Sequence, residues 1–159
     1  MKMPIITQQH QRGQSLVEFA LSFTIILTLL AGTVDLGSAF FSYIAIRDAA
    51  QEGALYGSIA AVVDNNPFNG KYDVGEALNT AAIETRVRQS SDHPVDLTDT
   101  SNVFVTISAS NPPCVGGWIT VMVRYDYQVT MPLIGAIIGT QTIPVRGSVT
   151  NTILKPACP

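Results

Sequence analysis

The sequence has few charged residues. Only 13% of its 159 residues are Asp, Glu, Lys or Arg, about half the share in an average soluble domain, while 47% are hydrophobic. This apolar content excludes disorder for most of the chain. The net charge of -3 leaves no basic surplus of the kind that nucleic-acid-binding domains carry. The length favours one domain, or one domain plus an anchor.

Cysteine and histidine are also scarce. The two cysteines, Cys114 and Cys158, are too few for a disulfide-dense scaffold or a four-thiolate zinc site. The two histidines, His10 and His93, lie in the N-terminal segment and a polar loop, and no motif links a Ser or Cys to either. The glycines form no phosphate-binding pattern. We therefore expect no enzyme activity, no metal, no cofactor and no small-molecule substrate.

The charges that are present are unevenly distributed. Residues 19–46 contain one, Asp35, whereas residues 47–99 contain thirteen of the twenty-one. Residues 100–159 contain four. The first region suits lipid or a helix-packed interior, the second suits water, and the third suits a sparsely charged sheet.

An apolar segment long enough to cross a membrane lies near the N-terminus. A membrane helix needs about 20 apolar residues to cross about 30 Å of hydrocarbon, and residues 19–40 provide them if Asp35 is tolerated near the outer end. An aspartate costs less there than at the midplane, where it costs about 2.5–3.5 kcal/mol. Lys2 and Arg12 precede the segment, and residues 1–17 contain no acid. The positive-inside rule therefore keeps this end cytoplasmic and places the bulk of the chain outside.

A cleaved secretory signal is the alternative interpretation of this segment. The basic residues before position 13 would form its positive region, and the small residues around Gly32 or Ala39 would form its cleavage site. Against this, the apolar pattern continues to Ile46 without a proline or turn cluster, and Glu18 places an acid at the start of the apolar stretch. Both features favour the membrane span.

The residues before the span resemble a known processing site. Residues 12–19, RGQSLVEF, are similar to the site at which a prepilin peptidase cuts type IV pilin-like proteins, directly after the glycine that ends a short basic leader. A cut between Gly13 and Gln14 makes Glu18 the fifth residue of the mature chain, as in that superfamily. The resemblance implies that Glu18 pairs with the N-terminal amine of a neighbouring subunit and so fixes the axial register.

The continuation is similar to the TadE-like (TadE/TadG) minor pilins of the tight-adherence, or Flp, pilus. Those typically read R-G-x-x-x-V-E-F-A, an apolar run, D-x-G-R, and then A-A-R-E-G-A-R-Y-G. The shared residues here include Asp35-Leu36-Gly37, Glu52-Gly53-Ala54 and Tyr56-Gly57. The sequence departs from the pattern with Ser38 and Leu55 where arginine is common, and with Gln51 before Glu52.

This resemblance, close over residues 12–57, implies a structural role. The protein would be a minor pilin or pseudopilin of the bacterial cytoplasmic membrane, single-pass, and incorporated in a cell-surface pilus or acting in its assembly. Its partners would be the lipid bilayer, the prepilin peptidase, other pilins and the proteins of the pilus assembly platform. The alternative is a single-pass membrane-anchored binding protein, with an extracytoplasmic domain, that does not polymerise.

Glu18 and Asp35 also have simpler interpretations. Ser15 and Glu18 fit a capping box at the start of a helix, where a carboxylate suits the positive end of the helix dipole. Asp35 lies about 26 Å further along the helix. It is either a wetted residue near the outer headgroups or a second polar contact between packed subunits.

The helix is expected to extend beyond the membrane. Residues 15–57 would span about 65 Å, so the second half should pack on an outer domain, with Ala50, Ala54 and Leu55 on one side. Beyond it the pattern predicts a turn over residues 65–70 and a second helix over residues 73–89. The apolar face of that helix would consist of Val74, Ala77, Leu78, Ala81, Ala82 and Val87.

Three β-strands are predicted in the last third of the chain. They cover residues 103–109, 118–130 and 142–153, and in the second strand alternate residues from Ile119 to Tyr127 share one face. Residues 131–139, MPLIGAIIG, are apolar but too short for a second span. They would lie on the membrane surface, on a partner, or packed under the sheet.

A disulfide between Cys114 and Cys158 is expected. It would close a loop of about 44 residues and stabilise the fold by about 2–4 kcal/mol, and an oxidising compartment outside the cytoplasm permits it. The sequence thus predicts an α+β protein with a leader (1–13), a long N-terminal helix (14–57) and an extracytoplasmic domain (58–159). That domain would hold the second helix and a roughly three-stranded antiparallel sheet.

Overall fold

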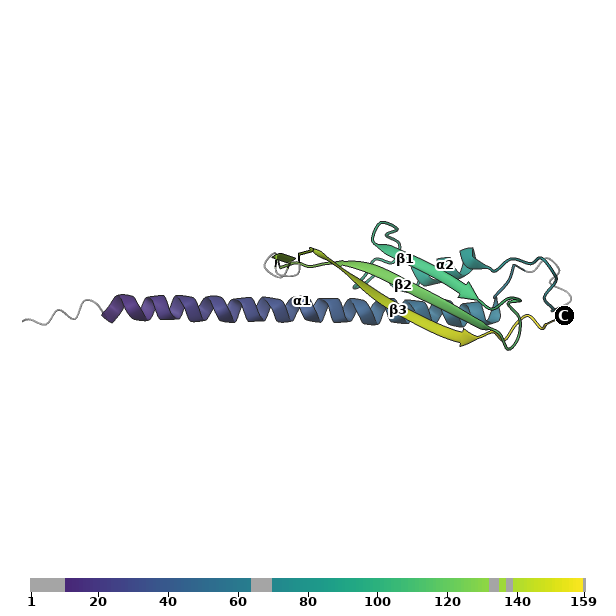
Figure 1. The fold of residues 1–159 in the computed structure, drawn as a ribbon, viewed down its shortest axis with the longest axis horizontal. Helices are drawn as coiled ribbons and strands as arrows, with labels where there is room; N and C mark the ends of the chain where they lie inside the picture. The colour runs from purple at the N-terminus through teal and green to yellow at the C-terminus, as the bar shows by residue number, and fades with distance from the viewer. Residues whose placement is uncertain (1–10, 64–69, 132–134, 137–138, 159) are drawn as a thin grey trace, which may run out of the picture.

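The computed structural model describes residues 11–63, 70–131, 135–136 and 139–158. Its elements are α1 (Gln11–Ile59), α2 (Thr80–Arg88), β1 (Val103–Ala109), β2 (Trp118–Gln128) and β3 (Thr142–Thr152). Figure 1 shows α1 as one long rod, with α2 and the sheet gathered along its C-terminal half. The predicted α+β class is confirmed. The turn predicted over residues 65–70 lies, except for Gly70, outside the described residues.

α1 is long because nothing in its sequence interrupts it. Its 49 residues include no proline, and at helical rise they extend about 74 Å, well beyond the thickness of a bilayer. The helix already includes Gly13 and Ser15. Ser15 therefore lies within the helix and not at its start, so the interpretation of Ser15 and Glu18 as an N-terminal capping box is wrong.

The sheet is antiparallel with strand order β1-β2-β3. Its register places Val121 opposite Ile107 on one side and Val149 on the other. Along β2 the inward residues Ile119, Val121 and Val123 are fully buried, which confirms the predicted alternation. β1 has the predicted bounds, whereas β2 and β3 end slightly earlier than expected.

Small residues bring α1 close to the sheet. One stripe of the helix is buried, at the spacing of successive turns: Ser42, Ala45, Ile46, Ala49, Ala50, Gly53, Ala54, Gly57 and Ser58. Opposite it, a Cβ added to Gly147 of β3 would lie 2.9 Å from the Cα of Arg47, so only glycine fits there. Leu55, predicted to share a side with Ala54, is instead 56% exposed, because adjacent helical residues point about 100° apart.

α2 is shorter than predicted and begins at Thr80 rather than at Asp73. The preceding residues form a turn, in which the Glu76 amide donates to the Asp73 carbonyl at 3.1 Å and the Asp73 amide donates to Glu76 Oε2 at 3.0 Å. Gly75 in this turn has a φ of +100°, which is incompatible with a right-handed helix. A helix therefore cannot pass through this position.

This shift changes which residues of the region are buried. Val74, predicted on the apolar face, is 94% exposed, and Leu78 forms an isolated antiparallel bridge with Val62 instead of a helical turn. The residues of α2 that enter the core are Ile83 and Val87, both fully buried.

Candidate functional site

The N-terminal half of α1, residues 13–41, extends beyond α2 and most of the sheet, and the far ends of β2 and β3 lie beside only its last turns, near Asp35 (Figure 1). We call it the exposed half of α1. Its large apolar side chains between Leu16 and Leu30 are 48–69% exposed. Continuous apolar surface of this kind indicates contact with lipid or with another protein, because it is costly to expose to water.

Four hydroxyl groups of the exposed half are satisfied within the helix. The side chains of Thr24, Thr28, Thr33 and Ser38 each donate to the carbonyl oxygen four residues earlier, at 2.8–3.0 Å. In hydrocarbon no water is available to hydrogen-bond a polar group. These hydroxyls therefore add little polarity to the helix surface.

Among the described residues, one helix is long and apolar enough to cross a membrane. It is α1, whose most apolar stretch has a mean hydropathy of 1.9 and is not buried against the rest of the chain. The buried core helix of a soluble protein has a comparable composition but a covered surface. Length, hydropathy and exposure together agree with a membrane anchor near the N-terminus.

The residues of the predicted processing site lie on the first turns of α1. A Cβ at Gly13 would meet nothing within 4 Å, and Gln14 Nε2 donates a long hydrogen bond of 3.4 Å to Glu18 Oε1. Gln14 and Glu18 are both exposed. The structure thus places Gln14 and Glu18 one helical turn apart on an accessible surface.

Asp35 is buried and forms hydrogen bonds with distant residues of the same chain, which neither interpretation of the sequence predicted. Its side-chain Oδ2 accepts a 2.9 Å hydrogen bond from the Met131 amide, and its carbonyl oxygen accepts a 3.3 Å bond from the Tyr127 hydroxyl. Only 7% of Asp35 is exposed. The sequence gives no local sign of these partners, because they lie more than ninety positions away.

The Glu52-Gly53-Ala54 motif packs α1 on the domain. Glu52 Oε1 accepts a 2.8 Å hydrogen bond from Arg86 Nε of α2. A Cβ at Gly53 would contact a methyl group of Val87 and lie 3.3 Å from Val121 Cγ1, while Ala54 is fully buried. The motif that carries part of the family resemblance is therefore a structural contact between α1, α2 and the sheet.

A groove of about 1020 Å³ lies between α1, the segment that follows α2, and the inner face of β2. Its lining includes Asp48, Arg86, Tyr125 and Tyr127. Burial raises the pKa of Tyr125, and the charges of Tyr127 and Asp99 act in the same direction. Within the part of the chain that the structure describes, no three His, Cys, Asp or Glu side chains gather in a way that could hold a metal ion.

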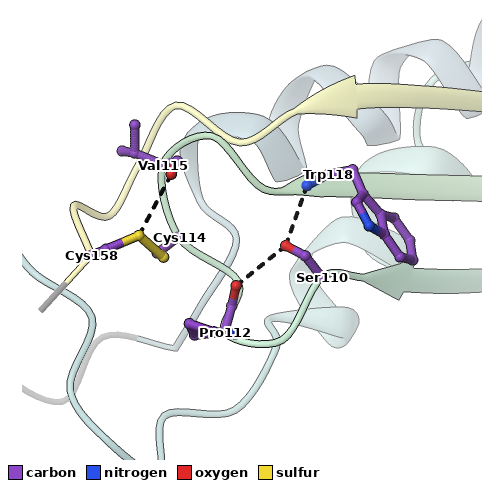
Figure 2. The surroundings of a disulfide bond; sticks show 6 residues. All are labelled: Ser110, Pro112, Cys114, Val115, Trp118 and Cys158. Atoms are coloured by element: carbon purple, nitrogen blue, oxygen red, sulfur yellow. Dashed lines mark hydrogen bonds between the residues drawn. A yellow bond between two sulfur atoms is a disulfide. The ribbon is translucent and has the colours of Figure 1, made fainter.

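The C-terminus is fixed to the β1–β2 connection by a disulfide (Figure 2). Cys114 and Cys158 are bonded, with their Cα atoms 5.1 Å apart, and the Cys158 sulfur lies 3.5 Å from the Val115 carbonyl oxygen. In the same connection, Ser110 Oγ accepts a 3.2 Å hydrogen bond from the Trp118 amide. The disulfide lies at the end of the domain that is remote from the exposed half of α1 (Figure 1).

Comparison with known proteins finds a family match for the N-terminal part of the chain. No curated protein and no solved structure matched the sequence. The model of a family described as TadE-like protein matches residues 13–55, which comprise the exposed half of α1 and most of its packed half. This match indicates a pilin-like protein associated with the tight-adherence pilus. The resemblance to TadE-like proteins that the sequence predicts is therefore confirmed over residues 13–55.

Proposed function

We propose that the protein is a minor pilin or pseudopilin, a structural component or assembly factor of a tight-adherence-type pilus. The observation that carries this proposal is the exposed half of α1, a helix with large uncovered apolar side chains within the TadE-like match. Such a surface can be stored in a bilayer and later packed against other helices. No catalytic role is assigned to any residue.

In this proposal a prepilin peptidase removes residues 1–13 as a leader, and residues 14–57 form the mature N-terminal helix. The span over residues 19–40 places residues 1–17 in the cytoplasm, and residues 58–159 form the domain outside. The disulfide between Cys114 and Cys158 supports this orientation, since disulfides persist in oxidising compartments.

Glu18 is proposed to pair with the N-terminal amine of a neighbouring subunit. The support is chemical: its hydrogen bond from Gln14 is long, at 3.4 Å, and a carboxylate in lipid or a dry bundle is costly without a charged partner. A cation supplied by the next subunit would offset that cost at one axial position only. The pair would thereby set the register of assembly.

Mass spectrometry of the mature N-terminus tests the processing step. The proposal expects the chain purified from its own membrane to begin at Gln14. An intact Met1, or a cut near Gly32 or Ala39, would contradict it. An intact N-terminus would favour the alternative of a membrane-anchored binding protein, for which the groove beside Tyr125 is the supporting observation.

The role of Glu18 is tested separately by substitution. Glu18→Ala and Glu18→Gln should leave membrane insertion intact but reduce piliation or assembly, measured by the recovery of sheared pili. Asp48→Ala is the matched control, because it removes an exposed acid of the same helix beyond the expected span. Normal assembly in both Glu18 variants would contradict the pairing role.

A further inference from the structure

β1 forms one edge of the sheet (Figure 1). The hydrogen bonds at its two ends fix the bonding pattern, since the Asp126 amide donates to the Asn102 carbonyl at 2.9 Å and the Ser110 amide donates to the Trp118 carbonyl at 2.8 Å. Bonded pairs alternate along an antiparallel ladder, so the even-numbered residues of β1 bond to β2. Three amides of β1 therefore point away from β2 and have no hydrogen-bond partner among the described residues: those of Val105, Ile107 and Ala109.

The sequence of β1 does not protect this edge. Exposed sheet edges are normally protected by charged residues or by proline, and the opposite edge strand, β3, has both in Pro144 and Arg146. β1, with the sequence VFVTISA, has neither. The chain contains no charged residue at all from Thr100 to Val123. β1 is therefore the open edge of the sheet.

The side chains along β1 define what an added strand would carry. Its three odd-numbered residues with free amides pack against the core but are still partly exposed, so they leave an apolar margin on the inner side of the sheet. On the outer side Phe104 is followed by Thr106 and Ser108, which are exposed and polar. Opposite residues of neighbouring strands share a face. A fitting strand therefore alternates apolar and polar residues and carries no charge.

A folded second copy of the chain fits this edge poorly. The strands run along α1 (Figure 1), so antiparallel pairing would reverse one α1 against the common orientation of the proposed span. Two parallel β1 strands related by a twofold axis would direct the same groups at each other at every level, which parallel pairing does not allow. Pairing with the β3 of another copy would rotate its α1 by about 60–75° over three strand steps, whereas membrane helices tilt by about 20° on average.

We propose that the β1 edge binds an extended, uncharged segment of another protein, a flexible tail or loop, which adds a strand beside residues 104–109. The turn over residues 100–102 limits this strand at one end, because the Val103 amide already donates to the Asp99 carbonyl at 3.0 Å. The exclusion of a second copy rests on the proposed span of α1. The open edge itself follows from the fold alone.

Amide hydrogen exchange of the full chain in detergent tests the edge. The probe is the acetylated and amidated peptide GSVTNTI, the sequence of residues 147–153, which is uncharged and alternates in polarity. Without peptide, the free amides of β1 should exchange rapidly, whereas those of Thr106 and Ser108 should be protected. Millimolar peptide should slow exchange of the free amides at least about twofold. The matched control is the same peptide with proline at the position of Thr150, which should give no protection.

Two variants of Ala109 test the pairing without disturbing the ladder. Ala109→Pro removes an amide that faces the open edge, a position at which an edge strand accepts proline. It should weaken peptide binding about two- to tenfold, as expected for one hydrogen bond. Ala109→Val keeps the amide and should retain the affinity. Titrations followed by the fluorescence of Trp118, which is bonded to the adjacent Ser110, measure both, and equal affinities would overturn pairing through this edge.

The remaining outcomes separate the occupants. Exchange protection that appears without peptide as the protein concentration rises would overturn the proposal in favour of a second copy. Equal slowing by the two peptides, or slowing by neither, would overturn the β1 edge as a binding site. These measurements need neither a pilus nor a processed N-terminus, so their failure is distinguishable from failure of the proposed function.

Discussion

The two halves of α1 belong to one continuous helix but present opposite surfaces. In the exposed half the large side chains are uncovered, with Leu29 66% exposed. In the packed half, residues 42–59, the buried stripe consists of Ala, Ser and Gly with the single large residue Ile46. Small residues allow the sheet to approach the helix axis, whereas large ones provide apolar surface to external surroundings. The distribution of side-chain size, more than hydrophobicity itself, separates the two roles.

The largest expected effect comes from truncating one large side chain in each half. Ile46→Ala should lower the free energy of unfolding of the domain by about 2–5 kcal/mol, because it leaves a cavity in a fully buried site. Leu29→Ala should change it by no more than about 0.5 kcal/mol. Urea unfolding in detergent, followed by Trp118 fluorescence, measures both. Similar losses in the two variants would show that the exposed half is packed on the domain.

Removal of the disulfide should act on the domain alone. The double variant Cys114→Ser/Cys158→Ser is expected to lose about 2–4 kcal/mol of unfolding free energy, measured in the same way. A reductant should destabilise the native chain by a similar amount and leave the double variant unaffected.

Helical circular dichroism from the exposed half should persist in detergent after the domain unfolds. Its loss in parallel with the domain would show that the helicity of the exposed half depends on the folded domain.

Two glycines of α1 offer a matched pair. A Cβ at Gly57 would lie 2.5 Å from Ile119 Cδ1 and 3.2 Å from Ile83 Cδ1, whereas at Gly37 it would meet nothing within 4 Å. Gly57→Leu should therefore cost about 1–3 kcal/mol through overpacking. Gly37→Leu should be neutral or stabilising, since it also replaces a poor helix former. Thermal unfolding in detergent distinguishes the two variants. Equal changes in the unfolding temperature would contradict the close packing of α1 on the domain at Gly57.

The smallest effect concerns pH. Tyr125 belongs to the inner face of β2, and burial raises its pKa above the ordinary value of 10.0. The folded state therefore holds the phenol proton more tightly than the unfolded state does. The resulting stability is fully present below about pH 10 and is lost as the pH rises through the raised pKa. Tyr125→Phe should flatten the alkaline decline in unfolding midpoint, and an unchanged decline would assign it to other groups.

Much of this fold follows from local sequence patterns. The bounds of β1, the alternation along β2 and the extent of the apolar helix were all predictable, because each depends on the periodicity of a few neighbouring residues. The start of α2 was not, because helical spacing continues through residues 73–79 while Gly75 and the Asp73–Glu76 turn interrupt the backbone. The partners of Asp35 were equally hidden, since they depend on how far β2 and β3 extend along α1.

The candidate site shows the same division. Residues 12–19 carry a family pattern that a single sequence reveals, and the family match includes Gly13 to Phe19. The structural purpose of Glu52 and Gly53 became apparent only when α2 was placed beside them, because Arg86 and Val87 are more than thirty residues away. Contacts between distant segments are set by tertiary packing, which local spacing does not encode.

The threonine and serine hydroxyls along α1 have a consequence for transfer between environments. Each of Thr24, Thr28, Thr33 and Ser38 donates to a carbonyl oxygen of its own helix, and the Asp35 carboxylate is already occupied by Met131. If α1 moves from lipid into a bundle of helices, these groups need no new acceptors and lose none. These five residues therefore contribute little to the free-energy difference between the two environments, and insertion or extraction requires little rearrangement of their hydrogen bonds.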